Sequence, residues 1–346
     1  MMNDSDRNMR KLSADKLPRM TDIQKVWHPD WFQGRRRRNN YFEGWYMKHV
    51  SPQGEHILSF IPGISLNKPD PHAFVQGIDG HSGQTWYFRY PPDAFHYAPD
   101  AFDIRIGNSR FSKNGIALDL ESDEARITGE IRYSERHTFP VSLHTPGIMG
   151  WYRYVPAMQC YHGVVSLDHQ LNGRIEVNGK DHDFSGGKGY VEKDWGSAMP
   201  EAWIWMQSNH FPQTRTSFML SIARVPWLGS SFPGFLGFFL HQGQPHYFAT
   251  YTGAKVNNLE VSEKEVSLRI DTKDKQLHIR GEKRTGSSAH GALKAPGKGH
   301  MERVIHENVN ASLFVSLTDK RGKVLFEGEG RHAGLEMIGD TSILQG

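Results

Sequence analysis

Two carboxylic acids and a tyrosine stand at alternate positions within one short segment of the chain. If this part of the stretch Gly186–Phe211 is a β-strand, the side chains of Tyr190, Glu192 and Asp194 share one face, and Val191, Lys193 and Trp195 fall on the other. Burial among apolar groups raises the pKa of a carboxylic acid, and a second carboxylate nearby raises it further. Such an acid keeps its proton near neutral pH and can donate it to a substrate. We therefore predict an acid site with Glu192, Asp194 and Tyr190 as candidate catalytic residues.

A segment that follows has the character of a pocket wall. Trp203, Trp205, Gln207 and Asn209 also alternate, so a strand would place two indole rings and two amides on one face. Ligand pockets combine apolar walls with a few polar groups in this way, and aromatic faces stabilise cations. We assign these four residues to substrate binding.

The chain repeats itself faintly, at an offset of roughly 160 residues. Glu43–Tyr46 is echoed by Glu201–Ile204, which pairs Trp45 with Trp203. Several further matches follow in the same order along the chain. The repeat predicts that the two tryptophans lie in equivalent strands, and it extends the substrate-binding assignment to Trp45 and Glu43.

Each assignment has a structural alternative. Glu192 and Asp194 also fit the solvent face of a half-exposed antiparallel strand. Trp203 and Trp205 also fit a hydrophobic core, and Glu43 also fits a structural partner of backbone groups or of an arginine. Periodicity alone leaves these alternatives open.

The overall charge does not indicate a highly charged partner. The 346 residues contain 41 Lys and Arg against 38 Asp and Glu, a formal net charge of +3, so we predict no nucleic-acid binding. The long basic run Arg35–Arg38 is most simply a solvated loop, and peripheral contact with a membrane is a secondary expectation. Cys160 is the only cysteine, which excludes an internal disulfide and fits a reducing compartment.

Several other features limit the class of protein. The N-terminus lacks the apolar core of a signal peptide, and no apolar run approaches the roughly 20 residues of a membrane-spanning helix. We therefore expect a cytoplasmic protein, with the inner face of the membrane as the place of any peripheral contact. No histidine spacing typical of a metal site is visible, so we predict no metal and no cofactor. A Gly-x-Ser-x-Gly motif is absent from the sequence, which weighs against a serine hydrolase.

Short segments rich in aromatic and β-branched residues predict an all-β protein. They are separated by many of the 35 glycines and 18 prolines, and long helical periodicity is absent from the sequence. Hairpin turns are predicted at Asn114-Gly115, Asn172-Gly173 and Asn178-Gly179. The predicted strands include His56–Ile61, Gln84–Tyr90, Gly115–Leu120, Arg126–Tyr133, Phe218–Arg224, Phe235–Leu240 and Val324–Gly328.

Pattern and repeat together predict two antiparallel β-domains in tandem. We place a loose tail at residues 1–25, a first domain at 26–196 and a second domain at 197–346. Each domain is expected to be a barrel or sandwich. A cleft between the domains, or the mouth of a barrel, is then the expected pocket.

Two motifs in the chain are similar to signatures of the tocopherol cyclase family. They are NNYFEGWYMK at Asn39–Lys48 and GGKGYVEKDWGSAMPEAWIWMQSNHF at Gly186–Phe211, and the likeness extends from about Trp27 to the C-terminus. Plant and cyanobacterial members close the chromanol ring of vitamin E. The resemblance implies two lipocalin-like domains and an acid-catalysed cyclisation of a prenylated quinol without a redox cofactor.

The family in turn resembles the carotenoid 1,2-hydratases more distantly. In those enzymes a Tyr-x-Asp element ahead of a Trp-Gly pair is implicated in catalysis. Tyr190, Glu192 and Trp195 occupy the matching places here, with glutamate in the aspartate position. This difference leaves open whether Glu192 or Asp194 is the acid.

Two classes of function remain. The first is a cofactor-independent cyclase or hydratase that acts on an apolar prenyl or isoprenoid substrate. The second is a lipocalin-like carrier that binds such a lipid without converting it. Burying carboxylates costs free energy and gives a pure carrier no advantage, so the acid pair favours the enzyme. The oligomeric state is open.

Overall fold

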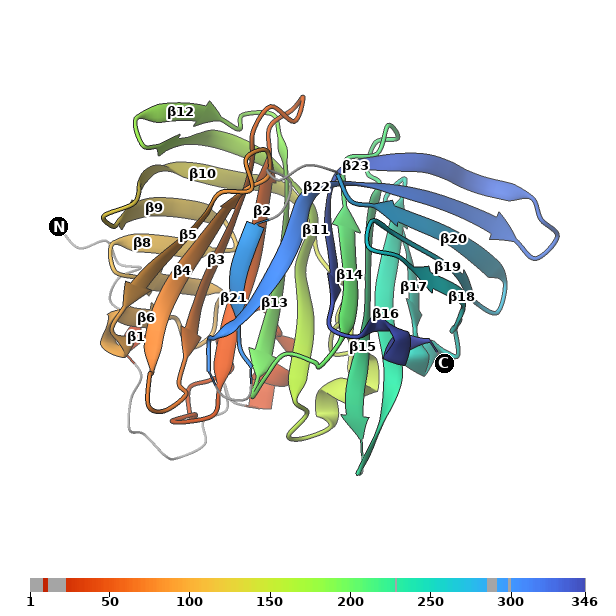
Figure 1. The fold of residues 1–346 in the computed structure, drawn as a ribbon, viewed down its shortest axis with the longest axis horizontal. Coiled ribbons are helices and arrows are strands. Elements are labelled where there is room, and N and C mark those ends of the chain that lie inside the picture. Colours follow the sequence, from red (N-terminus) through yellow and green to blue (C-terminus); the bar gives the residue numbers. More distant parts are fainter. Residues whose placement is uncertain (1–8, 12–22, 228, 285–290, 298–299, 346) are drawn as a thin grey trace. The chain divides into compact units, whose positions relative to one another are not determined.

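The computed structural model describes residues 9–11, 23–227, 229–284, 291–297 and 300–345, and these residues are mostly in β-strands (Figure 1). The prediction of an all-β fold is confirmed. The expected tail at residues 1–25 lies largely outside the described residues. In the part of the chain that is described, no helix is long and apolar enough to cross a membrane. The short 3-10 helices are η2 (Lys25–Trp27), η3 (Pro92–Ala94), η4 (Gly150–Tyr154), η5 (Thr250–Thr252) and η6 (Thr341–Leu344).

The first sheet is antiparallel and contains the strands β1 to β13. Its strand order is β1-β6-β7-β8-β9-β10-β11-β13-β2-β3-β4-β5, with β12 paired to β11, so it is an open sheet. Its strands are β1 (Arg10–Lys11), β2 (Phe42–Val50), β3 (Ile57–Ser65), β4 (His72–Asp79), β5 (Thr85–Tyr90), β6 (Phe95–Tyr97), β7 (Asp103–Ile106), β8 (Ser109–Ser112), β9 (Gly115–Glu121), β10 (Arg126–His137), β11 (Cys160–Val177), β12 (Lys180–Asp183) and β13 (Lys188–Gly196).

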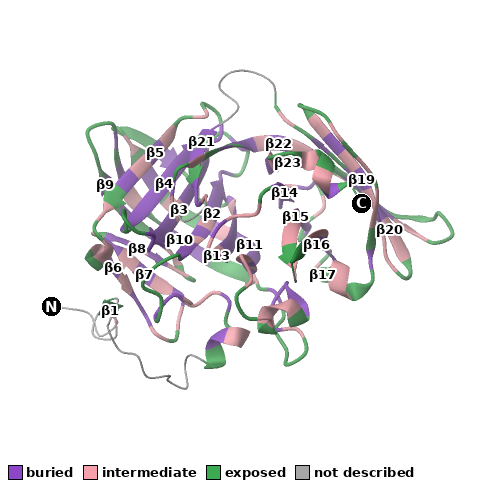
Figure 2. Ribbon diagram, turned by 60° about the horizontal axis from the view of Figure 1, so that its bottom comes forward, coloured by how far each residue is buried: buried purple, intermediate pink, exposed green. Residues whose placement is uncertain are grey.

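The first sheet curves so that strands far apart in its order face one another. His49 Nε2 in β2 lies 2.5 Å from the hydroxyl of Tyr133 in β10, although β13 and β11 separate these strands in the sheet. Trp45, also in β2, stacks on Phe102 with ring centroids 5.7 Å apart. These side chains are buried, and Figure 2 shows the same concentration of buried residues along β2, β3 and β4. The concave face of the sheet therefore encloses an aromatic core.

The second sheet is also antiparallel and open. Its order is β17-β16-β15-β14-β23-β22-β20-β19-β18, with β21 paired to β22. One face carries a hydrophobic core that includes Ile204, Met206, Leu220, Phe239 and Leu313. The strands are β14 (Trp203–Ser208), β15 (Ser217–Trp227), β16 (Ser230–His241), β17 (Gln244–Ala249), β18 (Lys255–Val261), β19 (Glu265–Asp271), β20 (Lys275–Glu282), β21 (Gly291–Ala295), β22 (Arg303–Asp319) and β23 (Val324–Ile338).

The chain divides into two compact units, with a main break between Met199 and Pro200. Two short segments belong to the unit on the other side of this break: residues 79–84 are part of the second unit, and residues 294–304 are part of the first. The two sheets share an order of neighbours: β13-β2-β3-β4-β5 in one corresponds to β23-β14-β15-β16-β17 in the other. Trp45 in β2 and Trp203 in β14 thus occupy equivalent strands, as the repeat predicts. The domain boundaries at 26–196 and 197–346 stay a prediction.

All seven of the predicted strands are present, whereas one of the three predicted hairpin turns is wrong. The turns at Asn114-Gly115 and Asn178-Gly179 connect β8 with β9 and β11 with β12. Asn172-Gly173 instead lies within β11. Gly173 has a φ of 141°, and a Cβ there would lie 2.0 Å from the carbonyl oxygen of Glu130. This glycine allows a close approach of two strands rather than a chain reversal.

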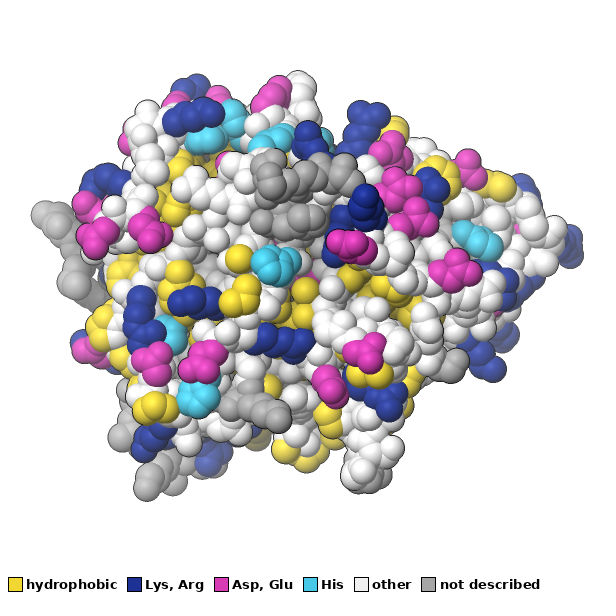
Figure 3. All heavy atoms as spheres, viewed as in Figure 1, with side chains coloured by type: hydrophobic (Ala, Val, Ile, Leu, Met, Phe, Trp, Pro, Cys, Tyr) yellow, Lys and Arg dark blue, Asp and Glu magenta, His cyan; other side chains and the backbone are white. Residues whose placement is uncertain are grey.

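Charged side chains are mixed over the face of the molecule seen in Figure 3. Cationic and anionic groups alternate there, without a large area of one sign. This distribution agrees with the formal net charge of +3.

Candidate active site

Strand β13 presents its acidic side chains on one face, as the alternation predicts. Tyr190 and Glu192 are buried there, and the Tyr190 hydroxyl donates a hydrogen bond of 2.6 Å to Glu192 Oε2. Asp194 follows on the same face and is partly exposed. Burial, and then the negative charge of Glu192, raise the pKa of Tyr190 well above its usual value. Tyr190 therefore remains a neutral hydrogen-bond donor.

His162 in β11 joins the two acids, and the sequence reasoning missed it. In the β11–β13 pairing His162 stands opposite Asp194, so both side chains point to the same side of the sheet. His162 Nδ1 lies 2.9 Å from Asp194 Oδ1, and Nε2 lies 3.5 Å from Glu192 Oε2. The second distance is long for a hydrogen bond but suits an ion pair. The imidazole thus bridges the two carboxylates.

The bridge keeps His162 protonated at neutral pH. Burial alone lowers the pKa of the imidazole, but the charges of Asp194 and Glu192 and the hydrogen bond to Asp194 outweigh this effect and raise the pKa to about 9. The protonated ring places one positive charge between two carboxylates. The cluster of Tyr190, Glu192, His162 and Asp194, hereafter the acid cluster, can therefore store and pass a proton.

Three members of the acid cluster also have the donor types of a metal site. Ligand atoms of His162, Glu192 and Asp194 all lie within 4.8 Å of one another. In the structure each ring nitrogen of His162 faces a different carboxylate, which is the arrangement of hydrogen-bonded and ion-paired groups. The geometry is more typical of a proton-linked triad than of a coordination sphere. The absence of a metal stays a prediction.

Glu43 lies on the opposite face of the first sheet, in a buried ion pair. Its carboxylate is 2.7 Å from Lys193 Nζ, and both side chains are fully buried. It also accepts hydrogen bonds from the Tyr41 hydroxyl and from the backbone N–H groups of Gln33 and Gly34. Of the two interpretations of Glu43, this geometry supports the structural one.

Lys193 fastens the segment before β2 to the same face. Its ammonium donates hydrogen bonds of 2.6 Å to the carbonyl oxygens of Pro29 and Trp31. It also lies 4.9 Å from the ring centre of Trp45 and 4.4 Å from that of Trp195. Trp45 is therefore part of this buried cation site and not of the acid cluster.

The other residues assigned to substrate binding lie in the second unit. Trp203, Trp205 and Gln207 are buried on the face of β14 opposite to Ile204 and Met206, and Asn209 follows directly after the strand. The Trp203 indole donates a hydrogen bond to Glu336. Among the described residues, neither amide atom of Gln207 has a hydrogen-bond partner. A buried amide without a protein partner is costly and is typical of a place where a ligand binds. Substrate binding by these residues stays a prediction.

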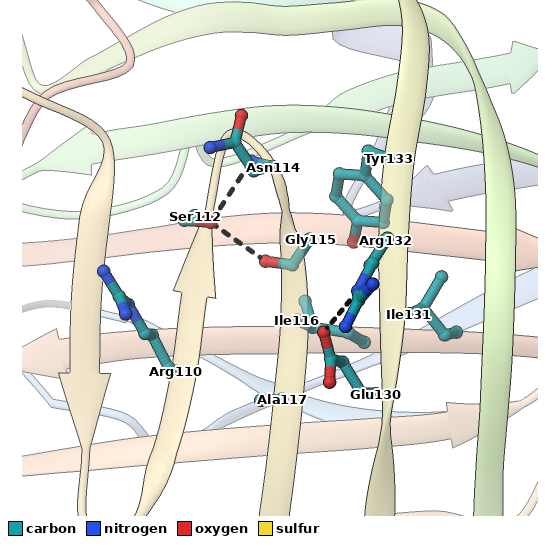
Figure 4. Close-up of a pocket in the computed structure, with 10 residues that line it drawn as sticks. All are labelled: Arg110, Ser112, Asn114, Gly115, Ile116, Ala117, Glu130, Ile131, Arg132 and Tyr133. Atoms are coloured by element: carbon teal, nitrogen blue, oxygen red, sulfur yellow. Dashed lines mark hydrogen bonds and ion pairs between the residues drawn. The ribbon is translucent and has the colours of Figure 1, made fainter. Parts of the chain in front are cut away.

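A separate hollow of about 520 Å³ lies over β8, β9 and β10 (Figure 4). Its charged side chains are paired within the protein, Arg132 with Glu130 at 2.8 Å and Arg110 with Asp103 at 2.5 Å. None of the acid-cluster residues lines it. We assign it no function.

Fold and site together define an all-β protein with a partly buried acid–imidazole cluster on paired strands of its first sheet. A family model described as tocopherol cyclase-like matches residues 130–339. This match covers more than half of the chain and includes the acid cluster. The chain therefore belongs to the tocopherol cyclase-like family.

Plant proteins provide partial sequence matches. A "Tocopherol cyclase, chloroplastic" from Zea mays is 29% identical over 109 residues, which are 30% of this chain and 23% of the maize protein. A "Probable tocopherol cyclase, chloroplastic" from Oryza sativa subsp. japonica is 26% identical over 134 residues, or 36% of this chain and 28% of the rice protein. The matched part is thus about a quarter of each plant protein.

Solved structures support the fold over most of the chain. CghA superimposes with a TM-score of 0.54 at 10% identity, covering 87% of this chain and 89% of CghA. The crystal structure of CghA with Sch210972 gives a TM-score of 0.52 at 8% identity, with the same coverage. At these identities the likeness concerns the fold alone.

Proposed function

We propose that this chain is a tocopherol cyclase-like enzyme that closes a ring on a prenylated quinol by acid catalysis. One observation carries the proposal: a buried glutamate, Glu192, lies between the hydroxyl of Tyr190 and the ring of His162. These residues lie within the part of the chain that matches the family model. The matched segments of the plant enzymes suggest the class of reaction.

The proposed reaction is an isomerisation. Glu192 takes up the proton that His162 holds and donates it to the less substituted carbon of a trisubstituted alkene, which leaves a tertiary carbocation. The phenolic oxygen of the quinol then attacks this carbon and forms the C–O bond of the new ring. The phenolic proton returns to the acid cluster, so atoms and charges balance without a redox step.

The acid cluster offers a route for recharging the acid. The side chains of Asp194, His162 and Glu192 are 26%, 12% and 6% exposed, in that order. Asp194 therefore contacts solvent, whereas Glu192 is almost fully buried. The two nitrogens of the His162 ring contact one acid each and so link Asp194 to Glu192. We assign Glu192 as the acid and His162 with Asp194 as the relay that returns its proton.

Tyr190 fits a supporting role. The Tyr190 hydroxyl, held neutral, donates to the Glu192 carboxylate that forms when the proton leaves.

The test is the conversion of a prenylated hydroquinone by the purified protein in D₂O. We expect an isomeric chromanol that carries deuterium at the ring carbon derived from the alkene CH. A product heavier by one water would identify a hydratase. Recovery of bound but unchanged hydroquinone would contradict the enzymatic proposal and support a carrier.

A further inference from the structure

The connection between β10 and β11, residues 138–159, carries an unusual set of exposed apolar side chains. Leu143 is 72% exposed and Trp151 46%, and Val141 and Tyr154 are also exposed. Four of the nine large exposed hydrophobic residues in the described part of the chain thus lie in one connection. Exposed apolar groups that gather in this way mark an interaction surface.

The backbone of this connection is held in place, so its apolar side chains are presented outward by an ordered segment. The Tyr154 hydroxyl donates a hydrogen bond to the carbonyl oxygen of Leu143. Ser142 and Thr145 close a tight turn through two backbone hydrogen bonds. The ring of Trp27 packs edge-on against Tyr154, with centroids 6.3 Å apart.

The surroundings of this surface are cationic. Residues 138–159 contain no acidic residue, and residues 23–41 contain only Asp30. Arg36, Arg37 and Arg38 are exposed in the second of these segments. The two segments are joined by Arg153, which donates hydrogen bonds to the carbonyl oxygen of Lys25 and to Gln33 Oε1.

The same connection adjoins the acid cluster. The N–H group of His162 lies 3.1 Å from the sulfur of Met149, the residue directly before η4. The exposed Trp151 and Tyr154 belong to η4 itself. A molecule that meets this surface is therefore next to the strand that carries His162.

We propose that Val141, Leu143, Trp151 and Tyr154 form a surface that docks on an anionic lipid bilayer, with Arg36–Arg38 on the headgroup phosphates. Tryptophan and tyrosine beside cationic residues are typical of side chains at a membrane interface. The proposal rests on the proposed function in one respect: a prenylated quinol resides in the bilayer, and this docking places the acid cluster beside its source. Large apolar side chains beside arginines match the apolar and headgroup layers that a bilayer offers at one surface, which is why we commit to a bilayer as the occupant.

Vesicle sedimentation tests this proposal without any assay of turnover. We expect the intact chain to pellet with vesicles of phosphatidylcholine and phosphatidylglycerol, and to bind pure phosphatidylcholine and high-salt samples more weakly. Leu143→Ser/Trp151→Ser should weaken partitioning at least about tenfold. Arg36→Gln/Arg37→Gln/Arg38→Gln should remove the preference for anionic lipid. The matched control is Val324→Ser/Leu325→Ser in β23, where the two side chains are 54% and 40% exposed.

The outcomes separate this proposal from the proposed function. Unchanged vesicle binding by Leu143→Ser/Trp151→Ser, with an unaltered urea unfolding midpoint, would overturn the docking surface. So would self-association of the intact chain that this double variant abolishes, because the surface would then cover a second copy. Turnover of a detergent-dispersed prenylated hydroquinone should be the same in intact chain and double variant. If no turnover is found at all, the vesicle result still decides the docking proposal.

Discussion

His162 determines the protonation state of the acid cluster. An unpaired imidazole in a buried place would be neutral, because burial disfavours the charged ring. Here the carboxylates of Asp194 and Glu192 reverse this preference and raise its pKa to about 9. The acid cluster therefore holds a proton at neutral pH that two isolated carboxylates would not hold.

This shift predicts an alkaline limit to turnover. Because the pKa of His162 in the folded chain is raised to about 9, from an ordinary value of 6.5, its proton is lost only as the pH rises through about 9. The same sign holds for stability: the contribution of the protonated ring is complete below about pH 6.5 and is lost through about pH 9. Asp194→Asn should lower the pKa of His162 and move the alkaline limb of the rate profile to lower pH. An NMR titration that finds His162 at or below 6.5 in the unaltered chain would contradict this.

A second prediction at this scale concerns metals. Each nitrogen of His162 faces a different carboxylate, so we expect turnover to survive dialysis against a chelator. Loss of turnover on chelation, followed by recovery with a divalent cation, would instead assign His162, Glu192 and Asp194 as ligands.

At the scale of the element, β13 places functionally different side chains on the two faces of the first sheet. Glu192 and Asp194 point to one side, whereas Lys193 points to the other and pairs with Glu43. The buried pair fastens residues 29–34 to the concave face through the Lys193 and Glu43 hydrogen bonds. One face of β13 thus carries the proposed catalytic acids, and the other carries the lysine that holds residues 29–34 in place.

Removing the anchor should cost stability. Lys193→Met leaves Glu43 buried without its cation, and we expect a loss of about 3–5 kcal/mol in the free energy of unfolding. The control is Arg126→Gln, whose pair with Glu121 is exposed and should contribute less than about 1 kcal/mol. Urea unfolding measures both. Equal losses of unfolding free energy for the two substitutions would show that the buried pair contributes no more to stability than the exposed one.

Gly173 provides another test of an element. Gly179 has a φ of 80° and no atom within 4 Å of an added Cβ, whereas a Cβ on Gly173 would meet the backbone of β10. Gly179→Ala should cost about 1–2 kcal/mol from its left-handed backbone. Gly173→Ala should cost clearly more, because β10 and β11 must separate. Similar unfolding midpoints for the two variants would rule out the close approach.

At the scale of the whole molecule, the sequence predicts local features such as alternation better than it predicts which distant strands pair. Alternation around Glu192 correctly separates the two faces of β13, and the repeat correctly relates Trp45 to Trp203. His162 is different, because it meets Asp194 through the register of β11 with β13, 32 positions apart along the chain. Asn172-Gly173 resembles a hairpin turn but lies within β11, so the turn prediction divides the strand whose register brings His162 to the acids. Trp45 and Glu43 show the same limit, because the register of β2 with β13 places them on the face of Lys193. Their assignment to substrate binding stays a prediction.

Turnover of Glu192→Gln tests the central proposal most directly. The substitution keeps the shape of the side chain and the partner of Tyr190 but removes the acid. We expect turnover of a prenylated hydroquinone to fall by roughly 10²–10⁴-fold with little change in ligand affinity, and Asp194→Asn to have a smaller effect. Unchanged turnover in Glu192→Gln, together with a collapse in Asp194→Asn, would contradict this assignment and make Asp194 the acid.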